Sequence, residues 1–212
     1  SKNHLQKKLR YILFLLVIIA ITKSNTMTDE LKKLGFKKIG TNNKIGNNIK
    51  SYNFSGTIGS NNRIDDDVTL KGKITIHNNV HIARGCTISA GKEGIIFENF
   101  STISNFVQVF GKSDDFTGDY FSEGTLEKKK RNFTKVYSKK IIFGKGSIVG
   151  SMSVILPGAY IAEFSTFGAH SIIKEITKPG YVYNNKKLIF KKKRNLKKLK
   201  ENYSKLNIFK TP

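Results

Sequence analysis

Several residue types are scarce in this chain of 212 residues, and each scarcity excludes a class of protein. The single cysteine, Cys86, rules out an internal disulfide framework and a zinc site built from cysteines. The four histidines are scattered and form no His-x-x-x-His pair, so we expect no metal ion. Tryptophan is absent and only three prolines occur, which excludes WD-type arrays and Pro-rich segments.

Acidic residues are also few, and the basic excess lies mainly at the two ends of the chain. Fifteen Asp and Glu stand against 38 Lys and Arg, which gives a net charge of +23. Residues 1–26 carry five basic and no acidic groups, while residues 180–212 carry eleven basic groups and one acidic group. Such arms indicate an anionic partner such as lipid headgroups, nucleic acid or a phosphorylated ligand. We expect no nucleic-acid partner, because no nucleic-acid-binding fold or RNP-type aromatic motif is recognisable.

Long apolar runs are scarce as well, and the longest is residues 11–21, behind a basic flank. Eleven helical residues reach only about 16 Å, well short of the ~30 Å hydrocarbon core of a bilayer. A secretion signal has this layout, but no small-x-small cleavage site follows at 22–26. The other interpretations are an interfacial or membrane-inserted helix and a helix that covers the open end of a domain. We expect residues 1–34 to form a basic and hydrophobic helical segment.

What the chain does contain is a large apolar residue at every sixth position. The run from 58 to 88 has no miss, the frame resumes at 97 after a small insertion at 91–94, and it resumes again at 143 after a break at 110–142. Six hits in one given frame arise by chance on the order of once in a thousand. The positions are Ile58, Ile64, Leu70, Ile76, Ile82 and Ile88, then Phe97, Ile103 and Val109, and finally Phe143, Val149, Ile155, Ile161, Phe167 and Ile173.

A period of six fits neither an amphipathic helix nor a heptad, but it fits a solenoid of short strands. Each hexapeptide would form one flat side with its large apolar residue inward, and Gly or Asn at the corners would tolerate positive φ. Stacked coils would then bury one continuous inner column. A β-sandwich is the weaker alternative, because strand alternation needs turns to repeat an inward residue every six positions. We predict an all-β solenoid over residues 35–178, with an inserted loop at 110–142 and a basic C-terminal segment at 179–212 that we expect to be helical.

The pattern [Ile/Leu/Val]-[Gly/Ala/Asp]-x-x-[small]-x resembles the hexapeptide-repeat acyltransferases, whose fold is a left-handed parallel β-helix. The match covers roughly residues 39–178 and is strongest over 149–172, which contains Ile-Leu-Pro-Gly and Gly-Ala-x-Ser. A second segment, Ser113-Asp-Asp-Phe-Thr-Gly-Asp-Tyr, is similar to one in sugar O-acetyltransferases of bacterial surface-polysaccharide gene sets. Handedness comes from the resemblance, since left-handed coils oppose the usual crossover preference.

The resemblance implies a homotrimer that uses acetyl-CoA to acetylate a sugar. Outward apolar residues such as Phe100 and Phe106 also favour a partner subunit. The coenzyme would lie along a coil edge between two subunits, where small residues admit the pantetheine arm and lysines meet the phosphates. Its expected contacts are Gly150, Ser151, Gly168, Ala169, Lys174 and Lys178.

The break at 110–142 contains the candidate catalytic residues. Acyl transfer from a thioester needs a base for the nucleophile, an oxyanion donor and orientation. Well-studied members of the family carry a catalytic histidine near the position of Lys112, but this chain has no histidine between 82 and 169. Asp114 and Asp115 are therefore the candidate bases, because adjacent acids repel and raise the pKa of one. The expected sugar contacts are Lys112, Phe116 and Tyr120.

Three functions remain open from the sequence. We place O-acetylation of a sugar of a surface polysaccharide or its precursor first, on the Ser-Asp-Asp-Phe segment. An amine deprotonates more easily than a hydroxyl, so the missing histidine favours N-acetylation of a nucleotide-linked amino sugar instead. A catalytically inactive scaffold or glycan binder is the third function, because relatives often end in Gly-Asn-Pro-Ala, which is absent here. We expect the enzyme to act at the cytoplasmic face of the membrane, held by residues 8–22 and the basic tail.

The other reactive side chains are expected to be structural. His77 and His81 flank Asn78-Asn79 within the repeat, so we expect them on the surface or at corners. His170 lies in the segment that relatives use beside the coenzyme. Cys86 is expected to be a packed thiol rather than a nucleophile.

Overall fold

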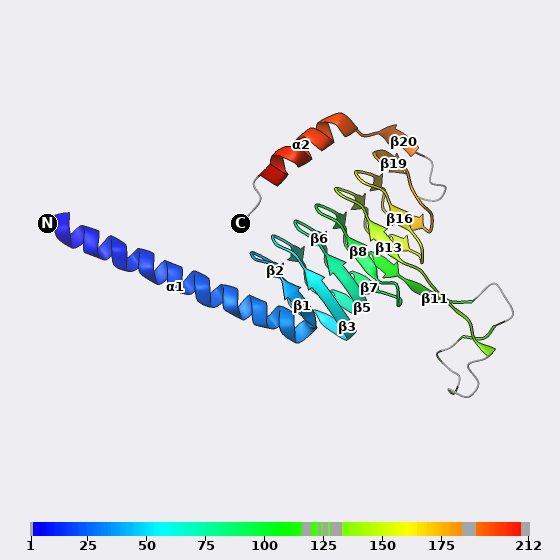
Figure 1. The fold of residues 1–212 in the computed structure, drawn as a ribbon, viewed down its shortest axis with the longest axis horizontal. Coiled ribbons are helices and arrows are strands. Elements are labelled where there is room, and N and C mark those ends of the chain that lie inside the picture. The colour runs from blue at the N-terminus through cyan, green and yellow to red at the C-terminus, as the bar shows by residue number, and fades with distance from the viewer. Residues whose placement is uncertain are drawn as a thin grey trace.

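The computed structural model describes residues 2–115, 120–122, 124, 127, 133–183 and 190–208. The chain winds into a left-handed parallel β-helix of about seven turns, as the sequence predicts. Each turn, or coil, contributes one short strand to each of three flat faces, and the coils stack side by side along the axis (Figure 1).

The first face is an eight-stranded sheet whose strands pair in parallel up to its last strand, which is antiparallel. In order, its strands are β2 (Lys44–Ile45), β4 (Arg63–Ile64), β6 (His81–Ile82), β9 (Thr102–Ile103), β14 (Ile148–Val149), β17 (Thr166–Phe167), β19 (Tyr181–Tyr183) and β20 (Phe190–Lys193).

The other two faces form one ten-stranded sheet, because β3 (Lys50–Ile58) and β5 (Thr69–Ile76) continue around the corner between them. The second face holds the first parts of β3 and β5, then β7 (Thr87–Ser89), β10 (Gln108–Phe110), β15 (Val154–Ile155) and β18 (Ile172–Ile173). The third face holds β1 (Phe36–Ile39), the last parts of β3 and β5, β8 (Ile95–Phe97), β13 (Ile141–Phe143) and β16 (Tyr160–Ile161).

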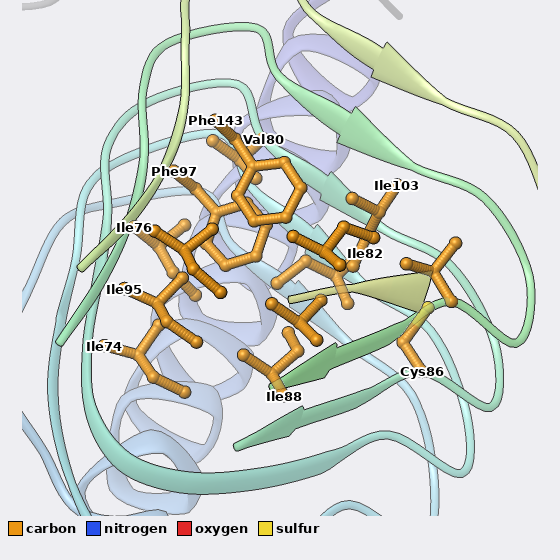
Figure 2. Close-up of a cluster of buried hydrophobic side chains, with 14 of the residues drawn as sticks. Ile74, Ile76, Val80, Ile82, Cys86, Ile88, Ile95, Phe97, Ile103 and Phe143 are labelled. Carbon is orange, nitrogen blue, oxygen red and sulfur yellow. The ribbon is translucent and has the colours of Figure 1, made fainter. Parts of the chain in front are cut away.

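The fifteen positions of the six-residue repeat form the core of this tube. All of them are buried, and none is more than 3% exposed. The strand register stacks them in three columns: Ile64 pairs with Ile82 and Ile82 with Ile103 on the first face. Figure 2 shows Ile76, Ile82 and Ile88 pointing into one interior from three sides. The predicted inward columns are therefore confirmed.

The corners between faces carry more side-chain types than predicted. Asn61 and Asn79 have positive φ, as expected for Asn, but so do bulky residues such as Phe106 and Phe164. Each of these aromatic rings lies against a glycine of the neighbouring coil: a Cβ on Gly85 would lie 2.4 Å from the Phe106 ring. Because the ring fills the space above the glycine, packing offsets the energetic cost of placing a phenylalanine backbone in the left-handed region of φ.

The N-terminal helix α1 (Lys2–Leu34) divides into two parts with different surroundings. Leu31 is 1% exposed and packs, with Met27 and Leu34, against the first coil, so this end of the helix covers the opening of the β-helix. The rest of α1 extends away from the body (Figure 1), and the large apolar side chains of residues 9–17 are 40–67% exposed. Within the described residues, no helix has the length and apolar character that a membrane crossing requires.

The C-terminal segment folds back onto the corner between the third and first faces. Strands β19 and β20 precede helix α2 (Leu196–Ile208). Tyr203 of this helix packs edge-on against the rings of Phe100 and Phe164, with centroids 5.5 and 6.0 Å apart, and its Oη accepts a hydrogen bond from Asn99 Nδ2 at 3.1 Å. Arg194 donates to the carbonyl oxygens of Gly146 and Phe164. Phe100, expected to meet a partner subunit, is thus partly covered by its own chain, because α2 lies over this corner.

Candidate functional site

The break in the repeat is an arm that leaves the corner between the second and third faces. Its base is an antiparallel pair, β11 (Lys112–Asp114) and β12 (Val136–Ser138), and Figure 1 shows it projecting from the tube. Glycines allow the arm to start there. A Cβ on Gly91 would lie 2.7 Å from the carbonyl oxygen of Gly111, and that oxygen also accepts a hydrogen bond from the amide of Lys139. Glycine at 91 and 111 therefore lets two neighbouring coils approach closely where the arm begins.

The two candidate bases lie in different surroundings at the end of β11. Asp114 is partly exposed, and its Oδ2 accepts a hydrogen bond from Ser122 Oγ at 2.6 Å. Across the described parts of the chain, its other oxygen, Oδ1, has no hydrogen-bond partner. Asp115 is only 5% exposed, and its amide donates to the carbonyl oxygen of Lys135. Of the two carboxylates, only that of Asp114 is open to a substrate.

Lys135 lies between two tyrosines on the arm, a group that the sequence analysis missed. Its Nζ is 5.4 Å from the ring centre of Tyr120 and 5.1 Å from that of Tyr137. A hydrogen bond with Tyr137 raises the pKa of Lys135 above its ordinary value, so the ammonium stays charged. Tyr120, expected to stack on a sugar, therefore already has a cation over one ring face. Phe116, the other expected aromatic contact, lies outside the described residues.

A hollow of about 580 Å³ opens at the root of the arm, over the coils that precede it. Lys112, an expected sugar contact, is part of its wall, together with three lysines that the sequence analysis did not select. Lys71 pairs with Ser89 in the next coil, and Lys92 follows three residues later in the insertion at 91–94, so the six-residue period does not group these lysines and only the structure brings them together. The lining residues are Asn53, Ser55, Lys71, Gly72, Lys73, Ala90, Gly91, Lys92, Lys112, Val136 and Ser138.

The expected coenzyme contacts are not gathered at one place in the chain. Gly150-Ser151 and Gly168-Ala169 stack in adjacent coils at the corner between the first and second faces, where a Cβ on Gly150 would lie 2.5 Å from the amide nitrogen of Ala169. Coil stacking alone therefore explains why residue 150 is a glycine. From the sequence we expected a different reason, namely room for the coenzyme. Lys174 follows β18 on the second face, and Lys178 lies beyond the third-face bridge at 176. These two exposed lysines are therefore not at the corner that carries Gly150 and Gly168.

The arm and this glycine edge stand at opposite ends of the second face. Strands of that face run from the corner at 150–153 to the corner at 156–159, roughly 15 Å apart at the rise of an extended chain. One chain therefore does not bring Asp114 next to Gly150.

Cys86 and the histidines lie apart from the arm. Burial raises the pKa of the Cys86 thiol to about 11, and its Sγ lies 3.1 Å from the carbonyl oxygen of Ser104, so the prediction of a packed thiol is confirmed. His81 Nε2 is 2.9 Å from Asp65 Oδ2. Burial raises the pKa of Asp65, but hydrogen bonds from His81 and Arg63 outweigh it and hold that pKa below its ordinary value. His170 is an exposed corner residue with φ of 58°.

Comparisons with known proteins give related enzymes. No protein-family model matches the sequence. The dTDP-4-amino-4,6-dideoxy-D-glucose acyltransferase of Escherichia coli is 32% identical over 150 residues, which are 69% of this chain and 76% of that protein. AntD, an N-acyltransferase from Bacillus cereus, has been solved as a serine-to-alanine variant with dTDP-4-amino-4,6-dideoxyglucose and coenzyme A. That structure is 31% identical with a TM-score of 0.76, covering 86% of this chain and 97% of AntD. AntD with dTDP and 3-hydroxybutyryl-CoA is 32% identical with a TM-score of 0.75, covering 87% and 97%.

Proposed function

This chain belongs to the hexapeptide-repeat acyltransferases, and we propose that it transfers an acyl group from a coenzyme A thioester to the amino group of a nucleotide-linked amino sugar. The E. coli relative is named for a dTDP-linked amino sugar, and AntD has been solved with that sugar nucleotide and coenzyme A. The observation that carries the proposal is the accessible carboxylate of Asp114 on the arm, where the sequence has no histidine to act as a stronger base.

The chemistry of the acceptor explains why a carboxylate suffices. A sugar ammonium must lose one proton before its nitrogen attacks the thioester carbon, whereas a hydroxyl is a far weaker acid. Asp114 Oδ1 would accept that proton, while Ser122 holds Oδ2 by its hydrogen bond. The C–N bond then forms and the C–S bond breaks; the nitrogen gives up a second proton, which the departing coenzyme thiolate takes, and Asp114 returns the first proton to solvent.

A second observation supports Asp114 over Asp115. Asp115, buried beside Lys135, is better suited to holding the arm together.

The test compares an amine with a hydroxyl at the same position of the acceptor. Purified protein is given acetyl-CoA or 3-hydroxybutyryl-CoA with either dTDP-4-amino-4,6-dideoxyglucose or dTDP-6-deoxyglucose, and release of the coenzyme thiol is followed. We expect turnover with the amine only, and a product whose acyl group resists mild base, as an amide does. Turnover with the hydroxyl acceptor or a polysaccharide, giving a base-labile ester, would instead support the O-acetylation that the sequence analysis placed first.

We also propose that the active enzyme is a homotrimer, in which the arm of one subunit meets the glycine edge of the next. The separation of Asp114 from Gly150 within one chain supports this, since substrate and thioester must meet. Mixing Asp114→Asn with Ala169→Trp tests it, because each variant keeps one intact half of the site. In an equimolar mixture that assembles at random, about a quarter of the interfaces join an intact arm to an intact glycine edge, and these interfaces should be active. No recovery from mixed trimers would mean that each subunit builds its own site.

The exposed part of α1 supports membrane association. Apolar side chains of residues 9–17 point to solvent on all sides of the helix, and Lys7, Lys8 and Arg10 lie beside them. A helix with this composition gains by burying its apolar surface at a bilayer interface while its basic residues meet anionic headgroups. We propose that α1 holds the enzyme at an anionic membrane surface.

A further inference from the structure

From the hollow at the root of the arm, we infer a binding site for the diphosphate of the acceptor, a nucleoside diphosphate sugar. The inference rests on the proposed function for the identity of the ligand, and on the shape and charge of the hollow for the site itself. Its volume of about 580 Å³ lies in the range of small-molecule pockets.

The floor of the hollow is made of backbone, because glycines remove side chains where coils approach one another. Strand β5 rounds the corner at Gly72, whose φ is +78°, and a Cβ there would lie 2.7 Å from the carbonyl oxygen of Ala90. Gly91 approaches Gly111 equally closely. Across the corner, β3 has a register shift between Tyr52 and Phe54, which leaves Asn53 on the wall. Bulges of this kind commonly occur beside functional sites.

The rim of the hollow is positive. Lys71 and Lys73 flank Gly72, while Lys92 and Lys112 come from the next coil and from the start of the arm; among the described residues, no acidic one lines the hollow. Across the residues that the structure describes, Lys71, Lys73 and Lys112 form no ion pair. Four ammonium groups around one concave surface repel one another unless an anion lies between them.

The carboxylate of Glu93, beside Lys92, does not neutralise this rim. The Glu93 side chain accepts a hydrogen bond from Ser138 Oγ, which holds the pKa of Glu93 below its ordinary value. Ser138 Oγ in turn accepts from the amide of Lys92 at 3.1 Å. The Nζ of Lys92 is 4.0 Å from Glu93, a loose contact in which the lysine is 85% exposed. The Glu93–Ser138 pair therefore fixes the wall, and most of the positive charge remains available to a ligand.

The position of the hollow suits the acceptor. Lys112 and Asp114 are two residues apart on β11, so their side chains point to the same side of the strand, roughly 7 Å apart along it. In a nucleoside diphosphate sugar the ring is bonded directly to the second phosphate. A diphosphate held by the lysines therefore presents the sugar to Asp114, with the nucleoside extending over β5. Coenzyme A also carries a diphosphate, but its expected edge lies at a different corner.

The experiment measures binding of the two diphosphate ligands separately. The double variant Lys71→Gln with Lys73→Gln is compared with the wild type and with Lys44→Gln, an exposed lysine on the first face. Titration calorimetry with dTDP and with coenzyme A gives both affinities, and inorganic pyrophosphate serves as the minimal competitor. We expect the dTDP affinity to fall by about 30-fold or more, since each charge-assisted contact to phosphate is stronger than a neutral one. Coenzyme A affinity and melting temperature should match those of Lys44→Gln.

Each alternative outcome has a distinct meaning. Loss of coenzyme A affinity with dTDP unchanged would assign the hollow to the coenzyme and overturn the inference. Unchanged affinity for both ligands would show that the lysines bind no diphosphate. Lysine-dependent binding of dTDP without acyl transfer to any dTDP-linked amino sugar would uphold the site while contradicting the proposed reaction.

Discussion

Replacement of Asp114 by asparagine separates proton transfer from every other role of this residue. The amide has nearly the same shape, and its oxygen still accepts the hydrogen bond from Ser122 that the carboxylate accepts at 2.6 Å. Its NH₂ group would take the place of Oδ1 but carries no lone pair for a proton. The arm and the substrate pocket should therefore remain intact, while the base is lost.

The expected magnitude follows from that single loss. General-base catalysis contributes about 10²- to 10⁴-fold, so kcat of Asp114→Asn should fall at least 10²-fold, or ~2.7 kcal/mol in the barrier. KM for the acceptor should stay within about threefold, because uniform binding is unchanged. The residual rate should rise about tenfold per pH unit until the acceptor amine is deprotonated in solution.

The matched control is Asp115→Asn, one residue along the same strand end. Asp115 is 5% exposed, so this variant should lower the melting temperature yet keep most of the activity of the folded enzyme. Coenzyme thiol release under saturating substrates, over a pH series, gives kcat for both variants. Full activity of Asp114→Asn would refute the assignment, and a collapse of Asp115→Asn alone would transfer the role to Asp115.

Three further predictions concern the fold and its surroundings. Gly85→Ala should lower the free energy of unfolding by about 1–3 kcal/mol, because φ of residue 85 is +71° and the added Cβ would lie 2.4 Å from the Phe106 ring. An unchanged midpoint of denaturant unfolding would show that the ring moves freely. Cys86, with its pKa raised to about 11, should resist iodoacetamide in the native protein at pH 8 and react once unfolded, whereas rapid native labelling would contradict its burial. Removal of residues 1–24 should abolish sedimentation with anionic vesicles, and the melting temperature should stay within a few degrees of that of the full chain because Leu31 still covers the first coil. Persistent sedimentation would place the membrane contact elsewhere.

The inward columns were predictable because they depend on local geometry alone. The large apolar position of each six-residue side points to the axis, so Ile64, Ile82 and Ile103 repeat wherever a coil repeats. The same reasoning located the arm, because a break in the period marks where the chain leaves the tube. Cys86 lies two residues before the inward Ile88 and so on the same side of the chain, which explains why it is packed.

The corners were less predictable, because neighbours from distant parts of the chain decide them. Gly and Asn were expected at positive φ, yet Phe106 adopts it because Gly85 lies beneath its ring. Phe100 was expected to face another subunit, and Tyr203, 103 positions further along the chain, partly covers it.

The candidate site shows the same division. Residue types and the break in the period singled out Asp114, Asp115 and Lys112, because chemistry and spacing are local properties of the chain. The difference between an open and a buried carboxylate, and the meeting of Lys71 with Lys112 at one hollow, depend on how the arm folds back and on which coil lies beneath it. Those distances are set by contacts between residues far apart in sequence, and only the tertiary structure decides them.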